Sequence, residues 1–431
     1  MRGSWGVVGL ALVATACGAF SSESSALWEG SPDSSFGGSG GDGAFGPEGG
    51  TLPDGSPAGD GVAPPPDAGG CRATTKGLDP GFGTAGVKLV PVQNAVATLT
   101  TRGDVLVAGV APCEVGSNSS RTALYRVPGG GGAATLVRCF QPERERPEAI
   151  DADGTGIALA TSYPDGGLSS ARLRRLKVDD GANRADDFEA RTAGWSTHPT
   201  STSRVGGRDV FAVYRTRTGG TLDPAGEIWV EGRSMVSLGT SAAVAMRAGS
   251  TASGPALVRV LMAIQSPTAV TIHRDTLAVN ALVPDTNFGP GGMRTLDLTN
   301  PSLGQYTSSS LALAGGSVAL GVPVALTATV RWLDSPPGGE RTLGPLGSAN
   351  AQVAVASRCD GSLLVGYFDN SQASNKGRIA RYPRPGTAID RDPAFDVQLP
   401  SVPRYLLPAS DDRVFVVRSE GNQTAVSVLG P

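Results

Sequence analysis

One short pattern recurs along most of the chain: a turn containing Asp and Gly is followed directly by a brief apolar run. The turns lie near positions 103, 154, 207, 254, 316, 361 and 412, a mean step of about 51 residues. Because the apolar runs are short, often β-branched and opened by turn-forming residues, they are predicted to be buried strands rather than helices. The clear runs are Val105–Ala108, Ile157–Ala160, Val210–Val213, Leu363–Val365 and Val414–Val417, and the weaker ones are Ala256–Val260 and Ser317–Gly321.

A second, more polar strand is predicted after most of these runs, since apolar and polar residues alternate there as in strands with one wetter face. Short strands repeated every roughly 40–60 residues are typical of β-propeller blades, and seven such units are enough to close a ring. We therefore predict an all-β fold, a single β-propeller of about seven blades of short antiparallel strands. The polar strands are expected at Thr122–Val127, Ala171–Val178, Ala328–Leu333 and Arg378–Tyr382.

The composition agrees with this fold class. Among 431 residues there are 61 Gly and 32 Pro, and only 17% are charged, which disfavours long helices. With 2 His and a net charge of −3, a His-rich metal enzyme and a strongly basic nucleic-acid binder are both disfavoured. The segment from Gln305 to Val330 has no charged residue and is long enough for a membrane span, but Gly315, Gly316, Gly321 and Pro323 divide it into strand-length pieces.

The N-terminus carries an export signal. Arg2 precedes the uncharged stretch Trp5–Ala16, which is too short for a stable membrane span and suits a secretory signal peptide. The following run, Ala14-Thr15-Ala16-Cys17-Gly18, resembles the lipobox of bacterial lipoproteins.

That resemblance implies a signal peptide over residues 1–16 and a diacylated Cys17 as the mature N-terminus, anchored in the membrane by its acyl chains. Gly18 stands where an Asp would favour inner-membrane retention, so outer-membrane delivery is expected, with the periplasmic or surface-exposed face left open. The alternative is an ordinary signal peptide cut near Ala16, with Cys17 incidental.

Residues 17–70 are predicted to be a disordered tether. Positions 21–70 consist mostly of Gly, Ser, Pro and Asp, contain no Lys or Arg and carry a charge of −8, so too few apolar groups are present to offset the entropy of ordering. Residues 71–431 form the predicted propeller and carry a net charge of +4, which fits an ordinary soluble surface.

Three further turns resemble one another: Leu78–Gly86, Pro284–Gly292 and Asp390–Phe395. Together with the Asp–Gly turns, they are similar to the delta-60 repeat, a tandem module of bacterial surface and secreted proteins. The resemblance extends over about residues 77–430 at uneven strength; it implies a propeller-like fold and transfers no catalytic residues. The strand Thr424–Val428 has no such turn after it, while the chain enters at Leu78 with that turn and no strand before it. We therefore expect the two ends to complete one blade together.

Candidate chemical groups are few. His198, expected in a loop, and His273, expected on a strand, have no second His at ligand spacing. The run Asp151–Gly156 has the alternating oxygen ligands of a calcium loop but lacks the closing Glu, and a β-turn accounts for it. A turn also accounts for the acidic cluster Asp390, Asp392 and Asp396. No cofactor or metal is expected.

The cysteines fit an oxidising compartment. With Cys17 lipidated, Cys71, Cys113, Cys139 and Cys359 remain, and three pairings are open. The preferred one joins Cys113 to Cys139, because only one polar strand separates them, and leaves Cys71 with Cys359. A free thiol at Cys71 is the alternative.

Two functions from different classes follow. The first is a non-enzymatic, monomeric envelope lipoprotein whose propeller binds or scaffolds a protein or a glycan, with the membrane as a second partner through the anchor and no nucleic acid. The second is a polysaccharide hydrolase or lyase with a carboxylate pair at the central channel. The lack of catalytic motifs favours the first.

Overall fold

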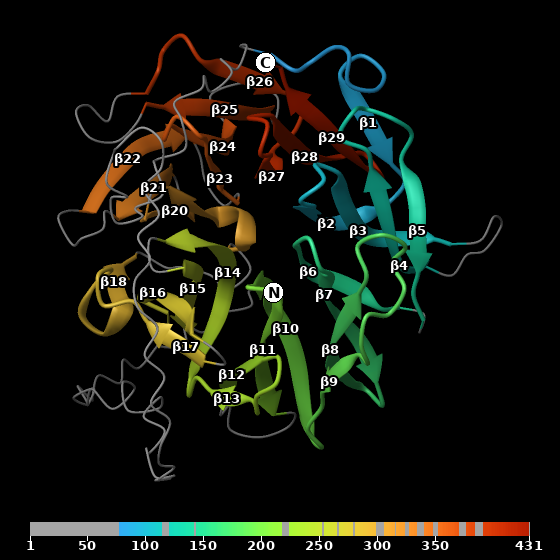
Figure 1. Ribbon diagram of the computed structural model, residues 1–431, viewed down its shortest axis with the longest axis vertical. Helices are drawn as coiled ribbons and strands as arrows, with labels where there is room; N and C mark the ends of the chain where they lie inside the picture. Colours follow the sequence, from blue (N-terminus) through green and yellow to red (C-terminus); the bar gives the residue numbers. More distant parts are fainter. Residues whose placement is uncertain are drawn as a thin grey trace, which may run out of the picture. The chain divides into compact units, whose positions relative to one another are not determined.

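The computed structural model describes residues 77–430, apart from 114–119, 142–143, 218–223, 252–253, 265–266, 279–280, 299–305, 315, 324–326, 334–339, 348–351, 370–375 and 384–390. Seven antiparallel sheets stand in a ring, with the first strand of each blade nearest the axis (Figure 1). The predicted seven-bladed β-propeller is therefore confirmed. The predicted signal peptide, Cys17, Cys71 and the tether lie outside the described residues.

Six blades are formed by strands consecutive in sequence, and the seventh joins the two ends of the described chain. The strands are: blade 1, β2 (Gln93–Leu99), β3 (Val105–Pro112), β4 (Ser120–Val127) and β5 (Thr135–Cys139); blade 2, β6 (Arg146–Ala152), β7 (Ile157–Asp165), β8 (Leu168–Leu176) and β9 (Phe188–Ala190); blade 3, β10 (Trp195–Val205), β11 (Arg208–Arg217), β12 (Ala225–Val230) and β13 (Val236–Ser237); blade 4, β14 (Ser241–Thr251), β15 (Gly254–Ala263), β16 (Ala269–Ala278), β17 (Ala281–Pro284) and β18 (Met293–Asp297); blade 5, β19 (Leu311–Ala314), β20 (Ser317–Pro323), β21 (Thr327–Leu333) and β22 (Glu340–Gly347); blade 6, β23 (Ala354–Ser357), β24 (Leu363–Asp369), β25 (Lys376–Tyr382) and β26 (Asp396–Leu399); blade 7, β27 (Pro403–Pro408), β28 (Val414–Glu420), β29 (Gln423–Leu429) and β1 (Val87–Val90).

The predicted apolar runs are the second strands of the blades, β3, β7, β11, β15, β20, β24 and β28. They are buried on both faces; Val105, Leu106, Val107 and Ala108 have no exposed surface. The hydrophobic clusters span neighbouring blades, as where Val330 of blade 5 packs with Val365 of blade 6. A single small sheet cannot cover both of its apolar faces, so burial requires a neighbour on each side and favours the ring.

The predicted Asp–Gly turns join the first strand of a blade to the second. In blades 1, 6 and 7 the turns share two hydrogen bonds, shown for blade 1 by Thr100 N to Asp104 O (2.9 Å) and Gly103 N to Thr100 O (3.0 Å). The equivalent bonds are Arg358 N to Ser362 O (2.9 Å) and Gly361 N to Arg358 O (3.0 Å), then Ala409 N to Arg413 O (2.8 Å) and Asp412 N to Ala409 O (3.2 Å). The turns predicted near residues 103, 361 and 412 are therefore confirmed, and those predicted near 154 and 207 lie between the first and second strands of blades 2 and 3.

The three turns that contain Phe also share one geometry. The Asp backbone N donates to the third strand of its blade: Asp79 to Val428 O (2.8 Å), Asp285 to Arg274 O (2.8 Å), and Asp392 to Arg381 O (2.9 Å). In each, the Asp backbone O accepts from the Phe N three residues on, at 3.2, 2.9 and 3.1 Å for Phe82, Phe288 and Phe395. The turn before β1 thus has the same place in blade 7 as its counterparts in blades 4 and 6.

The ring is closed in blade 7, where the first described strand of the chain pairs with the last. β1 pairs antiparallel with β29, with Val87 opposite Ser427 and Val90 opposite Thr424. Gly430 N also donates to Gly77 O (3.0 Å), so the two ends of the described chain meet. The expectation that both ends complete one blade is confirmed.

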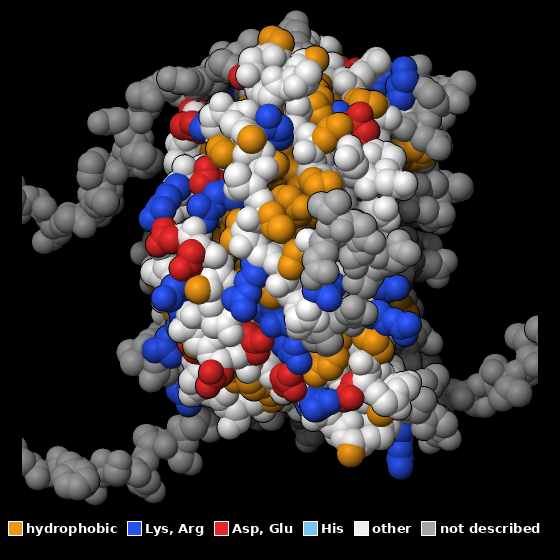
Figure 2. Space-filling model, turned by 90° about the vertical axis from the view of Figure 1, so that its right-hand side faces the viewer, with side chains coloured by type: hydrophobic (Ala, Val, Ile, Leu, Met, Phe, Trp, Pro, Cys, Tyr) orange, Lys and Arg blue, Asp and Glu red, His pale blue; other side chains and the backbone are white. Residues whose placement is uncertain are grey.

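The uncharged stretch from Gln305 to Val330 contains the short 3₁₀ helix η4 (Ser308–Ser310), then β19, β20 and the beginning of β21. The prediction that Gly and Pro divide it into strands is confirmed at Gly316, between β19 and β20, and at Pro323, where β20 ends, whereas Gly321 lies inside β20. In the described part of the chain no helix combines the length and apolar character that a membrane crossing requires. Acidic and basic side chains are interspersed on the side of the propeller shown in Figure 2.

Candidate functional site: the central channel

The first strands of the blades line a channel with two connected parts. The wider part, here called the mouth, has a volume of about 700 Å³ and opens among the first-to-second strand turns, including Thr101, Gly207 and Ser410. The narrower part, here called the chamber, has a volume of about 240 Å³. Ser308 and Tyr405 line both parts, so the two parts adjoin.

Small and aliphatic side chains form most of the lining of the mouth, among them Ala97, Ile150, Val205, Gly249 and Leu407. The charged lining residues are Asp151, Asp153, Arg204 and Arg247. The hydrogen bonds and ion pairs of these four side chains determine whether they are available to a ligand or substrate.

Asp151 ends β6 and is held by blade 3. Its carboxylate accepts hydrogen bonds from Ser203 Oγ (2.9 Å), from the Arg204 backbone N (2.8 Å) and from the Ala152 backbone N (2.9 Å). Desolvation raises the pKa of Asp151, and these hydrogen bonds oppose the rise. The carboxylate therefore connects two blades through bonds to fixed groups.

Arg247 of β14 reaches across to blade 5, where its Nη1 donates to Leu311 O (2.7 Å). Desolvation in the channel lowers its pKa, and the negative charge of Asp151 opposes that shift. The guanidinium therefore forms part of the channel wall.

Asp153 lies in the turn between β6 and β7, where it accepts from Thr155 N (2.7 Å) and Gly156 N (3.0 Å) and pairs with Arg204 Nε (3.0 Å). Burial would raise the pKa of Asp153, but the hydrogen bonds from Thr155 and the charge of Arg204 outweigh it and hold the pKa low. Arg204 also pairs with the fully buried Asp209. The run Asp151–Gly156 is thus a turn tied to blade 3, as the sequence indicated.

β-Bulges shape the chamber. The register of the first strand shifts in β2, β6, β10, β14 and β27. In β6, β10 and β14 the residues at the shifts are Glu148, Thr200 and Val244, and all three line the chamber. A bulge adds an unpaired residue and re-aims its side chain, which here turns it toward the axis.

Glu148 is the only ionisable acid among the chamber's described lining residues, which include no Lys, Arg or His. Its Oε1 accepts from Ser162 Oγ of β7 (2.7 Å). Desolvation raises its pKa, and the hydrogen bond from Ser162 and the charge of Arg146 oppose the rise. Three tyrosines complete the polar lining: Tyr214, Tyr306 and Tyr405.

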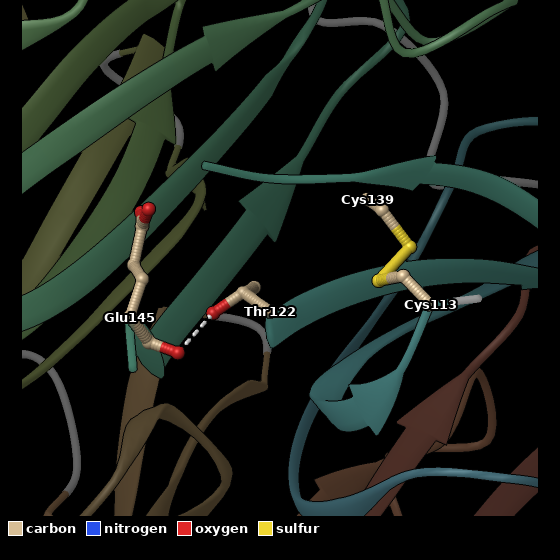
Figure 3. Close-up of a disulfide and its surroundings, with 4 residues drawn as sticks. All are labelled: Cys113, Thr122, Cys139 and Glu145. Atoms are coloured by element: carbon tan, nitrogen blue, oxygen red, sulfur yellow. Dashed lines mark hydrogen bonds between the residues drawn. A yellow bond between two sulfur atoms is a disulfide. The ribbon is translucent and has the colours of Figure 1, made fainter. Parts of the chain in front are cut away.

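The predicted disulfide between Cys113 and Cys139 is confirmed. It joins the end of β3 to the end of β5 across β4, with the Cα atoms 6.1 Å apart, and lies near the Thr122–Glu145 contact that links blade 1 to blade 2 (Figure 3). Cys359 is disulfide-bonded as well. Cys71 and Cys17 lie outside the described residues, so the Cys71–Cys359 pairing and the lipidation of Cys17 stay predictions.

His273 lies on β16, as predicted, whereas the prediction of a loop at His198 is wrong. His198 is on β10, where the register shift after Pro199 lets the strand tolerate a proline. The centroid of its ring lies 4.8 Å from that of Tyr214, a residue of the chamber lining, and the two rings stack.

The acidic cluster predicted to lie in a turn is described only in part. Asp392 lies in a Phe-containing turn and Asp396 begins β26, while Asp390 is outside the described residues. No group of three His, Cys, Asp or Glu suited to a metal occurs among the described residues.

The chamber was not predicted from the sequence. Its residues come from blades 2, 3, 4, 5 and 7, so no local spacing brings them together. The available signal was proline or polar residues inside otherwise apolar stretches, as at Pro147 and Pro199, which mark bulges.

No protein-family model and no curated protein matches the chain. Similar solved structures include hydrazine synthase from Kuenenia stuttgartiensis, at 14% identity over 78% of this chain and 94% of that one, with a TM-score of 0.47. A prolyl endopeptidase is 14% identical over 80% of this chain, which spans 47% of that protein, with a TM-score of 0.47. TolB from Acinetobacter baumannii is 13% identical over 75% of this chain and 65% of that one, with a TM-score of 0.36. Likenesses this distant assign no activity to the chain.

Proposed function

We propose that the protein is a non-enzymatic envelope lipoprotein, anchored in the outer membrane through Cys17, whose propeller binds a protein or glycan ligand at the mouth of its channel. The observation that carries the binding role is that every charged side chain among the described residues of the mouth is engaged by protein groups. Asp151 and Asp153 accept from fixed donors, and Arg204 and Arg247 are held by Asp209 and by the backbone of blade 5. A mouth of this kind offers shape and small side chains to a ligand.

The binding role is tested by blocking the mouth. Ser250 and Ser410 are exposed and line it. Residues 71–431 are immobilised, and the material retained from envelope extracts is identified by mass spectrometry. The ligand is expected to be retained by the wild type and by Thr240→Trp, an exposed residue that is not part of the mouth lining, and lost with Ser250→Trp and Ser410→Trp. Equal retention by all four proteins would place binding elsewhere.

The anchor is tested separately. Cells expressing the full chain are labelled with radioactive palmitate, and membranes are fractionated by density. The wild type should carry label and sediment with the outer membrane, whereas Cys17→Ala should carry none. Label on the Cys17→Ala variant would contradict the assignment.

One observation keeps the enzymatic alternative in view: Glu148 and Asp151 are carboxylates of the same channel, and both have a raised pKa. A raised pKa suits a general acid in glycoside hydrolysis. Release of reducing ends from envelope polysaccharide that disappears in both Glu148→Gln and Asp151→Asn would support that alternative. Release unchanged by either substitution would remove it.

A further inference from the structure

One carboxylate of the chamber, Glu148, is not part of an ion pair among the described residues. Glu148 lines the chamber, and its carboxylate accepts a hydrogen bond from the neutral Ser162 hydroxyl. Arg146, the cation whose charge acts on it, lines a separate cavity between blades 1 and 2. Arg247 faces the mouth and is held by Leu311 O. A carboxylate that is partly removed from water and forms no ion pair can bind a positively charged group.

The chamber also contains a hydrogen-bonding group without a partner. Tyr306 is only 3% exposed, and its hydroxyl has no hydrogen-bond partner. Nearly all buried polar groups in folded proteins are paired, so this hydroxyl would be satisfied by a polar group bound in the channel. Because Tyr306 lines the chamber, that group would lie within reach of the channel.

Aromatic rings complete the arrangement. Tyr214 of β11, Tyr405 of β27 and Tyr306, which lies just before η4, line the same small space as Glu148. The faces of aromatic rings attract cations, and the attraction grows when the cation is desolvated. The chamber's volume of about 240 Å³ corresponds to about eight water molecules, which limits the ligand to a small molecule or the end of a longer one.

We propose that the chamber binds the primary ammonium group of a small organic ligand. Its N–H groups would donate to the Glu148 carboxylate and to the Tyr306 hydroxyl oxygen, while the tyrosine rings surround its carbon atoms. A primary ammonium fits better than a quaternary one, because the two oxygens need N–H donors. This inference deepens the binding role proposed above and rests on it: the chamber would recognise the charged end of a ligand that enters through the mouth.

The test compares three probes of similar chain length on the full wild-type protein by ligand-observed NMR titration: n-butylammonium, 1-butanol and n-butyltrimethylammonium. Butylammonium is expected to bind at least about tenfold more tightly than either of the others. Equal binding of butanol would overturn the role of charge. Equal binding of the trimethyl probe would overturn the assignment of a primary ammonium. Neither comparison needs a variant, so a folding defect cannot obscure the result.

Variants then locate the site. Glu148→Gln keeps the size of the side chain and should weaken butylammonium binding at least about tenfold, while Tyr306→Phe removes only the hydroxyl and should weaken it about threefold. Glu340→Gln, an exposed carboxylate on β22, should leave it unchanged. Unchanged binding in Glu148→Gln would overturn the proposal. If butylammonium fails to bind while the mouth-dependent capture described above persists, the chamber proposal fails and the binding role stands.

Discussion

A left-handed backbone conformation recurs at one position of the first-to-second strand turns. Gly103, Gly361 and Asp412 have φ angles of 83°, 74° and 67°, and each lies at the same point of an equally hydrogen-bonded turn. Glycine adopts this conformation freely, whereas a side chain with a Cβ does so at a cost. The repeat therefore constrains the backbone here, and blade 7 tolerates an aspartate because Asp is one of the few residues that visit this region.

Gly103→Ala is predicted to lower the free energy of unfolding by about 1 kcal/mol, because the left-handed cost exceeds the entropy that alanine removes from the unfolded chain. Sterics contribute little, since the nearest atom to an added Cβ would be Arg413 Nη2 at 3.9 Å. Gly103→Asn should cost less, because Asn adopts this conformation more readily than Ala. Urea denaturation measures both. An alanine variant as stable as the wild type would contradict the argument.

The burial of His273 predicts that the stability of the protein depends on pH. Desolvation, and next the positive charge of Arg259, lower its pKa from 6.5 to about 4, with Asp275 opposing. The folded state therefore binds this proton less readily than the unfolded state. The stability that neutral His273 contributes is complete above pH 6.5 and is lost as the pH falls toward 4.

His273→Gln should remove this part of the pH dependence. The difference in unfolding free energy between the wild type and the variant should shift by about 2 kcal/mol against the wild type from pH 7 to pH 4, after allowance for the partial exposure of the ring. Chemical denaturation at both pH values measures it. A constant difference would show that the ring is as easily protonated in the fold as outside it.

At the scale of the elements, the Phe-containing turns fasten neighbouring blades together. Phe82, Phe288 and Phe395 are at most 3% exposed and belong to three different hydrophobic clusters. Phe82 packs edge-on against Phe415 of blade 7, with ring centroids 5.9 Å apart. Phe288 lies under the guanidinium groups of Arg274 and Arg294, at 4.9 and 5.2 Å. These contacts lie within one blade, and each Phe also belongs to a hydrophobic cluster that includes side chains of a neighbouring blade.

Phe288→Ala is predicted to destabilise the protein by about 3–4 kcal/mol, through lost burial, an unfilled cavity and lost cation–π contacts. Leu89→Ala is the matched control, because Leu89 is a large apolar residue that is 46% exposed; its cost should stay below about 1 kcal/mol. Thermal and urea unfolding of the two variants give the comparison. Similar losses in both would refute a special role for the turn.

The elements differ in how far the sequence predicts them. Second strands such as Val105–Ala108 and Val414–Val417 are buried on both faces, so they appear as unbroken apolar runs behind a fixed turn. The first strands are harder to recognise, because a bulge within them reverses the alternation of faces, as at Glu148 in β6. The chamber could not be predicted for the same reason: its side chains are aimed by bulges and gathered by ring closure.

At the scale of the whole molecule, the stability of the closed ring depends on which blades are neighbours and less on where the chain begins and ends. β1 supplies the fourth strand of blade 7, the turn before it bonds to Val428, and Gly430 bonds to Gly77. If β1 were removed, β29 would become an open edge and the ring would lose the bond between its ends. The fold should therefore tolerate new ends elsewhere, provided that this strand is kept.

A circular permutant tests this directly. Joining residue 430 to residue 77 through a short glycine linker and opening the chain between Gly166 and Gly167 keeps every strand. Those glycines form the tip of the turn between β7 and β8, and a Cβ added at either would touch nothing within 4 Å. The permutant should fold with a melting temperature within about 5 °C of the linear chain 77–430, because cutting an exposed loop tip removes no buried contact.

Deleting residues 77–91 from the linear chain should instead lower the melting temperature by well over 10 °C or cause association through β29, since blade 7 then loses a whole strand. If the permutant fails while the truncated chain folds, the shared blade is dispensable, and the ring is held by contacts between neighbouring sheets alone.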